Sequence, residues 1–241
     1  MSTKLFNNGL GHTLFDKLKG IAKEMTTFDR FLAVVGFFRS SGYFKLRKEL
    51  GDVSEIKVLV GINIDDIFRK HNKALLMLAD EEKAKKIYHE GFKEDIIHAQ
   101  YAPEVEEGIL QMCEDLVSGR LQMRIHATKN LHAKFYLCLP HQHNEHSDGW
   151  VIMGSSNISD SGLGITRSPR YELNVAMKDY DDVKYCSDEF HILWEEAIPL
   201  TAADIEQYKD ETYLGYQPTP YELYIKVLID TFGDQVEDDF S

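Results

Sequence analysis

The sequence predicts an α/β fold in which a mixed β-sheet is flanked by helices. The runs FLAVVGFF (31–38) and EIKVLVGI (55–62) are short, apolar and rich in β-branched or aromatic residues, which is typical of buried strands. The segment between them (41–50) predicts a short helix, and this β-α-β order favours parallel neighbours with a right-handed crossover. The segment HAKFYLCL (132–139) adds a strand with alternating polarity.

The remaining segments fit the same fold. A helical spacing of apolar residues near the N-terminus predicts an amphipathic helix; these residues are Leu14, Phe15, Leu18, Ile21 and Met25. Residues 72–119 have mostly helical patterns. Three more strands are predicted at 121–127, 150–153 and 171–177. A short helix is predicted at 158–164 and a long helix at 181–197.

The composition changes after Pro199. Residues 201–213 and 220–232 predict two helices, and Thr219 followed by Pro220 is a typical helix start. We therefore expect a main domain at 1–198 and a small helical extension at 199–241.

The bulk properties predict a soluble cytoplasmic protein. The net charge is −13, which argues against broad electrostatic capture of nucleic acid, so phosphate contact needs a local basic cluster. Cys113, Cys138 and Cys186 form no CxxC pair and are expected to be reduced thiols. No leader-like apolar core and no run of 18 apolar residues occur, so neither secretion by that route nor a membrane span is expected.

His132 and Lys134 are the first candidate site residues. Their spacing of two places both side chains on one face of a strand. An ammonium group attracts phosphate oxygens, and an imidazole can attack phosphorus or move a proton near neutral pH. The alternative is a surface histidine and lysine on an amphipathic strand.

The segment VIMGSSNIS supplies the second candidate. An apolar strand runs into Gly154, Ser155, Ser156 and Asn157, where glycine allows close backbone approach and the polar side chains can donate to phosphate. The alternative is that Ser156, Asn157 or Ser159 caps the following helix.

Glu172 begins an otherwise apolar strand and therefore needs a partner. It could orient the His132 imidazole, as carboxylates do in catalytic triads. The alternative is a salt bridge with Arg167 or Arg170.

Together, His-x-Lys, Gly-Ser-Ser-Asn and the later glutamate resemble the phospholipase D superfamily across residues 10–197. The family signature continues from HxK through four residues to an aspartate, but this sequence has Leu139 there. The arrangement resembles the nuclease branch: metal-independent restriction endonucleases and phospholipase D-like domains fused ahead of bacterial helicases. The resemblance implies a phospholipase D/nuclease-like fold.

The resemblance also implies a mechanism. Family sites use two HxK motifs, so a chain with one should act as a homodimer, in which one His132 forms a phosphohistidine and the other serves as acid and base. Lys134, Asn157, Ser155 and Ser156 would bind phosphate oxygens, Glu172 would orient the imidazole, and neither a metal nor another cofactor would be needed. Nucleic acid, most simply DNA, would contact four basic residues: Arg39, Lys129, Arg167 and Arg170.

The helicase-fused type implies a motor in the same polypeptide or operon, and 199–241 resembles the connector towards it. The chain has no Walker A pattern. A non-catalytic DNA-targeting or protein-interaction module is the alternative function, and a lipid phosphodiesterase is a third. The loop HQHNEH offers His141, His143, Glu145 and His146 as zinc ligands, but a hairpin loop is a poor frame for a metal site.

Overall fold

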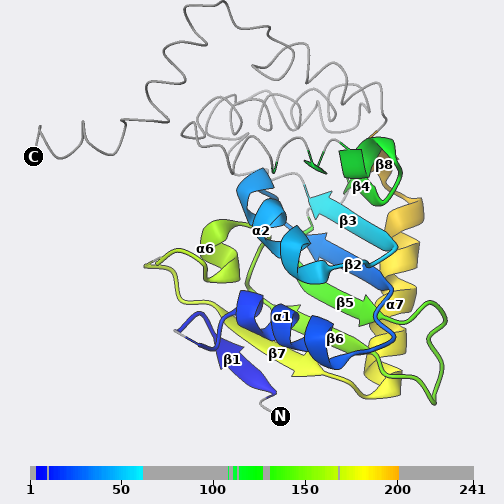
Figure 1. Ribbon diagram of the computed structural model, residues 1–241, viewed down its shortest axis with the longest axis horizontal. Helices are drawn as coiled ribbons and strands as arrows, with labels where there is room; N and C mark the ends of the chain where they lie inside the picture. The colour runs from blue at the N-terminus through cyan, green and yellow to red at the C-terminus, as the bar shows by residue number, and fades with distance from the viewer. Residues whose placement is uncertain are drawn as a thin grey trace, which may run out of the picture.

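The computed structural model describes residues 4–9, 11–61, 108, 111–112, 114–126, 131–167 and 169–200. Eight strands within this part form one mixed sheet in the order β1-β7-β6-β5-β2-β3-β4-β8 (Figure 1). The predicted α/β fold, with a mixed sheet flanked by helices, is confirmed.

The middle of the sheet is parallel. β2 (Arg30–Val35) pairs with β3 (Glu55–Gly61), and β3 pairs with β4 (Leu121–His126) in the same direction. Helix α2 (Ser40–Leu50) connects β2 to β3, as the sequence predicts. β2 and the second half of β3 are nearly continuously apolar because both faces of the sheet are covered there, whereas β4 alternates buried and more exposed residues.

The rest of the sheet is antiparallel. β5 (Phe135–Leu139) pairs with β2, β6 (Trp150–Gly154) pairs with β5, and β7 (Leu173–Met177) pairs with β6. The short strands β1 (Leu5–Asn7) and β8 (Ile198–Pro199) are antiparallel edges beside β7 and β4.

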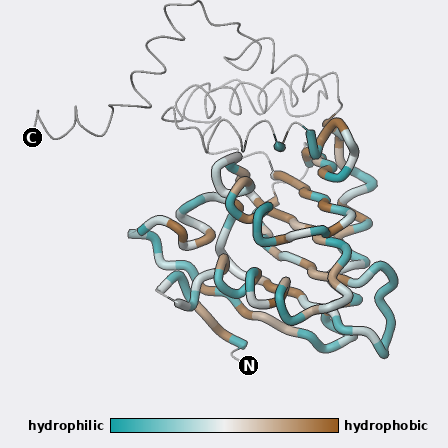
Figure 2. Tube along the Cα trace, viewed as in Figure 1, coloured by the Kyte–Doolittle hydropathy of each residue, from teal (hydrophilic) through white to brown (hydrophobic). Residues whose placement is uncertain are grey.

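Helices cover the two faces separately (Figure 1). α1 (Leu14–Glu24) packs with α2 on one face; it begins with a capping box in which Thr13 and Asp16 exchange hydrogen bonds. α7 (Tyr180–Glu195) packs on the other face, against alternate residues of β2, β5 and β6. Figure 2 shows the hydrophobic residues concentrated along the strands between these layers.

Two predicted strands begin later than expected. The strand predicted at 132–139 starts at Phe135, and the strand predicted at 171–177 starts at Leu173. His132, Lys134 and Glu172 therefore lie in the extended segments that enter these strands.

The sequence prediction missed both edge strands, which are too short to show a clear alternation. The other predicted elements within the described residues are present, with ends shifted by a few residues. Most of the helices predicted at 72–119, and both predicted after residue 200, lie outside the described residues.

A buried polar network ties α2 to the helical turn at 114–117. The carboxylate of Asp115 is 3% exposed and accepts hydrogen bonds from the Tyr43 hydroxyl (2.9 Å) and from Arg47 Nε (2.7 Å). Burial and the neighbouring Asp115 carboxylate raise the pKa of Tyr43 far above its usual value, so the phenol remains a donor.

We expect Asp115→Ala to lower the free energy of unfolding by about 3–5 kcal/mol, because it leaves the Arg47 guanidinium with no carboxylate in a buried place. Urea denaturation followed by circular dichroism measures this. Glu114→Ala, one residue away and exposed, is the matched control and should change stability by less than about 0.5 kcal/mol. Equal losses for the two variants would show that the network contributes little.

Candidate active site

Four chain segments meet at one edge of the sheet. β2 and β6 end there, whereas β5 and β7 begin there, because each of these neighbouring pairs is antiparallel. The backbone keeps the segments in register beyond the strands. Gly154 N–H donates to the Lys134 carbonyl (3.1 Å), and Ser155 N–H donates to the Leu173 carbonyl (3.2 Å). The motifs around Lys134 and Ser155 are therefore direct neighbours.

Lys134 and Asn157 gather around Gly36, the first residue after β2. A Cβ atom placed on Gly36 would lie 3.5 Å from Lys134 Nζ and 3.6 Å from Asn157 Oδ1. Phe37 N–H donates to Asn157 Oδ1 (3.0 Å), and this bond leaves Nδ2 as the donor end of the amide. The absence of a side chain at Gly36 leaves room beside the Lys134 ammonium, the Asn157 amide oxygen and the Leu131 carbonyl, which would lie 3.3 Å from the same Cβ atom.

His132 is exposed, whereas Lys134 is 8% exposed. Lys134 Nζ donates to the His132 carbonyl (2.8 Å) and lies 3.4 Å from His132 Nδ1. The two side chains are thus on the same side of the chain, as their spacing predicts. The lysine contacts hold the backbone of His132, and the imidazole remains open to a ligand.

Glu172 and Ser155 form the other half of the site. The Ser155 hydroxyl donates to the Glu172 carboxylate in a short hydrogen bond, and Leu173 N–H donates to Ser155 Oγ (3.1 Å). Asn8 supports the same turn, because its amide donates to the Arg170 carbonyl and its oxygen accepts from Glu172 N–H. In this structure the carboxylate holds Ser155, not the imidazole of His132.

Glu172 also acts on Lys134 through its charge. Burial lowers the pKa of Lys134 from its ordinary value, and the negative charge of Glu172 opposes this effect by raising it. The carboxylate therefore helps to keep a desolvated ammonium charged. A phosphate group in the space at Gly36 would meet that ammonium in a partly dehydrated setting, where its attraction is stronger.

Ser156 is placed differently from the expectation. Its side chain is fully buried and accepts a hydrogen bond from Asn174 Nδ2 (3.0 Å), while its carbonyl accepts from the Tyr136 hydroxyl (2.7 Å). We therefore no longer assign Ser156 to phosphate binding, because a buried, bonded hydroxyl is not available to a ligand. The helix-capping alternative holds for Ser159, which accepts from Gly162 N–H at the start of α6 (Asp160–Leu163).

Leu139, at the position of the family aspartate, lies at the far end of β5 from the site. It is five residue steps along the chain from Lys134, which corresponds to about 17 Å in an extended strand. Its side chain is fully buried in the core beneath α7. The leucine therefore removes no polar group from the space around Gly36.

The basic residues predicted to contact nucleic acid are spread over two loops. Arg39 lies at the end of the segment that follows Gly36, with its guanidinium carbon 4.4 Å from the centre of the Phe37 ring. Arg167 and Arg170 are exposed in the loop between α6 and β7 that leads to Glu172. Lys129 lies outside the described residues.

The histidine loop between β5 and β6 has local partners. His141 pairs with Asp29 (3.0 Å), and the ring of His143 lies 5.3 Å from that of Tyr180 in a tilted arrangement. Among the residues that the structure describes, no three histidine, cysteine, aspartate or glutamate side chains are grouped to hold a metal ion.

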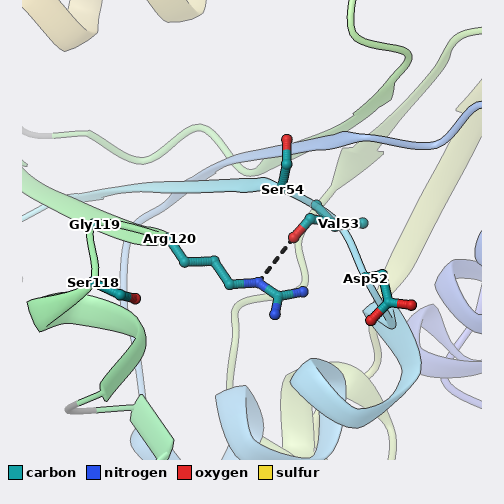
Figure 3. Close-up of a pocket in the computed structure, with 6 residues that line it drawn as sticks. All are labelled: Asp52, Val53, Ser54, Ser118, Gly119 and Arg120. Atoms are coloured by element: carbon teal, nitrogen blue, oxygen red, sulfur yellow. Dashed lines mark hydrogen bonds between the residues drawn. The ribbon is translucent and has the colours of Figure 1, made fainter.

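An open pocket lies at the opposite edge of the sheet, where β3 and β4 begin (Figure 3). It is lined by Asp52, Val53, Ser54, Ser118, Gly119 and Arg120. Arg120 is engaged there with the carbonyls of Val53 and Gly51, so the pocket is held together by structural bonds. It contains none of the candidate site residues.

Sequence reasoning missed three residues of the site. Gly36 has a detectable signal, because a glycine interrupts the apolar run FLAVVGFF just where the strand ends. Phe37 was assigned to that strand, although its ring is only partly buried. Asn8 gives no local signal, because its partner Glu172 is 164 positions away.

A known protein family matches the part of the sequence that carries this site. Residues 82–194 match the family model described as "Cardiolipin synthase, PLD-like domain". The matched segment includes His132, Lys134, Asn157 and Glu172. A search of curated proteins gave no significant match. In the described part of the chain, no helix is long and apolar enough to span a membrane.

Several solved structures resemble the fold at low identity. Phosphatidylserine synthase from Haemophilus influenzae Rd KW20 is 10% identical, with a TM-score of 0.50, over 96% of this chain and 46% of that one. Nuc from Salmonella typhimurium, a phospholipase D family member, is 8% identical, with a TM-score of 0.47, over 83% of this chain and 98% of that one.

The archaeal chromatin protein TrmBL2 is 13% identical, with a TM-score of 0.42, over 83% of this chain. This chain spans 54% of TrmBL2, and so about half the length of that protein and of the synthase. Residues 82–194, a little under half of the chain, are thus similar to a PLD-like domain, and the mixed sheet with its flanking helices is consistent with that similarity.

Proposed function

We propose that this chain is a metal-independent phosphodiesterase that cleaves nucleic acid, most simply DNA, through a phosphohistidine intermediate. The observation that carries the proposal is the convergence of Lys134 Nζ and the Asn157 amide on the bare Cα of Gly36, beside the exposed His132. Enzymes of the phospholipase D-like superfamily hydrolyse or transfer phosphodiesters, and the site has the groups for that chemistry.

His132 is the nucleophile in this scheme. One imidazole nitrogen attacks phosphorus and forms a P–N bond while the P–O bond to the leaving group breaks. A second imidazole protonates the departing oxygen, then removes a proton from water, which attacks phosphorus and breaks the P–N bond. The product phosphate leaves and both imidazoles return to their starting states.

Lys134 and Asn157 stabilise the charge that builds up on the non-bridging oxygens. Ser155 presents its hydroxyl at the same edge of the sheet, held by Glu172. Glu172 acts here through Ser155 and through the charge of Lys134. The orientation of the imidazole by Glu172, expected from the sequence, would require the carboxylate to move from Ser155 when substrate binds.

The second imidazole comes from a second copy of the chain. An apolar patch beside the site supports this homodimer. Leu5 lies opposite Val175 in the sheet, and Val175 lies opposite Met153, so the three side chains form a row across β1, β7 and β6. Leu5 is 62% exposed, Leu173 is 49% exposed and Met153 is 36% exposed.

We call Leu5, Met153, Leu173 and Val175 the edge patch. Met153 and Leu173 are within two residues of Ser155 and Glu172, so an isologous contact over the edge patch would bring two sites towards each other. Such a contact would also remove exposed apolar surface from water.

The wider setting is also a proposal. We assign residues 1–198 to the phosphodiesterase domain and 199–241 to a connector towards a helicase motor in the same polypeptide or operon, in the cytoplasm. Leu139, in place of the family aspartate, would favour the non-catalytic alternative, a DNA-targeting or protein-interaction module, if that position belonged to the site. Leu139 instead lies far from the site along β5.

We expect His132→Ala to reduce cleavage of a labelled DNA strand in the presence of EDTA by about three orders of magnitude or more, because it removes the nucleophile. His146→Ala, in the exposed loop between β5 and β6, is the control and should retain activity. Full activity of His132→Ala would refute the assignment, and a wild-type chain that binds DNA without cutting it would favour the non-catalytic module.

The pH profile tests the electrostatic role of Glu172. Binding of an uncut DNA strand to His132→Ala protein requires the Lys134 ammonium, so the affinity should fall as pH rises through the pKa of Lys134, which burial places below its ordinary 10.5. Glu172→Gln in the same background removes the charge that raises this pKa, and this alkaline limb of the affinity should move to lower pH. Glu145→Gln, in an exposed loop, should leave the limb in place. If Glu172→Gln leaves the alkaline limb at the same pH, the charge of Glu172 does not maintain the Lys134 ammonium.

Sedimentation equilibrium tests the edge patch. Wild-type protein should have twice the chain mass of 27.7 kDa, and Leu173→Glu should shift it to the monomer by placing a charge in the apolar contact. Val117→Glu, at a similarly exposed apolar residue (56%) outside the edge patch, is the matched control and should remain dimeric. A dimer that persists in Leu173→Glu would place the interface elsewhere.

A further inference from the structure

The segment that connects β2 to α2 separates its side chains by alternation. Phe38 points into the core, where it is 6% exposed and its ring lies 6.1 Å from that of Tyr43. Phe37 and Arg39, on either side of it, are only partly buried. Phe38 therefore packs this segment against the core around Tyr43, and Phe37 and Arg39 lie on the opposite side of the segment.

Three contacts attach this segment to the Asn157 segment. Phe37 N–H donates to Asn157 Oδ1 (3.0 Å), Arg39 N–H donates to the Ile158 carbonyl (2.8 Å), and Phe38 pairs with Ile158 in a parallel bridge. Because the backbone of Phe37 is bonded directly to Asn157, its aromatic ring is held one residue from the space at Gly36.

Phe37 and Arg39 form a layered pair. The guanidinium carbon of Arg39 lies 4.4 Å from the centre of the Phe37 ring, within the range of a cation–π contact. A guanidinium plane and an aromatic ring both stack with nucleobases. The Phe37 ring is only partly buried, so part of it is accessible from solvent.

We propose that Phe37 and Arg39 form a stacking site for one unpaired nucleobase next to the phosphate held at Gly36, so that the substrate is single-stranded nucleic acid. This inference rests on the proposed function for its phosphate site. Bases inside a duplex already stack on each other, so a paired base would have to leave its helix before it reached Phe37. The pair thus selects for an unpaired strand, while Lys134 and Asn157 bind its backbone.

Binding to matched oligonucleotides tests the proposal. Full-length His132→Ala protein, which leaves the strand uncut, is titrated by fluorescence anisotropy with three labelled probes: a single strand of DNA, a strand of equal length with abasic positions, and a duplex. The abasic strand has the same phosphates but no bases. We expect the normal strand to bind about tenfold tighter than the abasic strand, the size expected for the stacking of one base.

Changes at Phe37 and Arg39 should act on that ratio. Phe37→Leu in the His132→Ala background keeps an apolar side chain without a ring and should bring the ratio of the two affinities close to one, whereas Phe37→Tyr should preserve it. Arg39→Lys keeps the charge but not the plane and should also reduce the ratio. Phe28→Leu, at a partly buried phenylalanine before β2, is the matched control and should leave the ratio unchanged.

Equal affinities for the normal and abasic strands, a ratio unaffected by Phe37→Leu, tighter binding of the duplex, or no binding of any probe would each overturn the stacking site. Cleavage by the wild-type chain is scored separately and reports on the proposed function. A wild-type chain that shows the base-dependent ratio but no cleavage would retain the stacking site and refute the nuclease. Cleavage without a base-dependent ratio of affinities would support the nuclease and refute the stacking site.

Discussion

Strand β5 runs antiparallel to both of its neighbours, β2 and β6, and this pairing decides which chain ends meet at the site. If β5 were parallel to β2, Lys134 would lie at the opposite edge of the sheet from Gly36. The antiparallel pairing instead brings the start of β5 beside the ends of β2 and β6. The apolar core on both faces of β2 and β5 stabilises this register, so the position of Lys134 depends on the whole sheet.

The second constraint is electrostatic. A chain with net charge −13 repels a polyanion at long range, so any phosphate chemistry has to depend on a few local groups. Lys134 is desolvated at the sheet edge, which strengthens its attraction for phosphate and at the same time lowers its pKa. Glu172 opposes the loss of charge without occupying the space at Gly36, because its carboxylate is bonded to Ser155. A carboxylate placed directly on Lys134 would instead compete with the substrate.

Much of the sheet was predictable from the sequence, because long apolar runs and alternation report on burial directly. The spacing of two between His132 and Lys134 also predicted that they share one side, and Lys134 Nζ contacts the His132 carbonyl. The edge strand β1 was not predictable, because its three residues are too few to show an alternation of polarity. The role of Asn8 was not predictable either, because its hydrogen bond to Glu172 spans 164 positions. Ser156 was misread because a motif does not reveal which of two adjacent serines turns inward. The structure shows that Ser156 is buried against Asn174, whereas Ser155 is exposed.

In the proposed mechanism, His132 forms a covalent bond to phosphorus. The direct test is rapid quench of the wild-type chain during turnover of labelled DNA, in alkali to preserve an acid-labile P–N bond, followed by peptide mass spectrometry. We expect a phosphorus-linked adduct on the peptide that contains His132, which appears and decays within the turnover time. Turnover with no adduct, or with the adduct on another side chain such as His146, would contradict it.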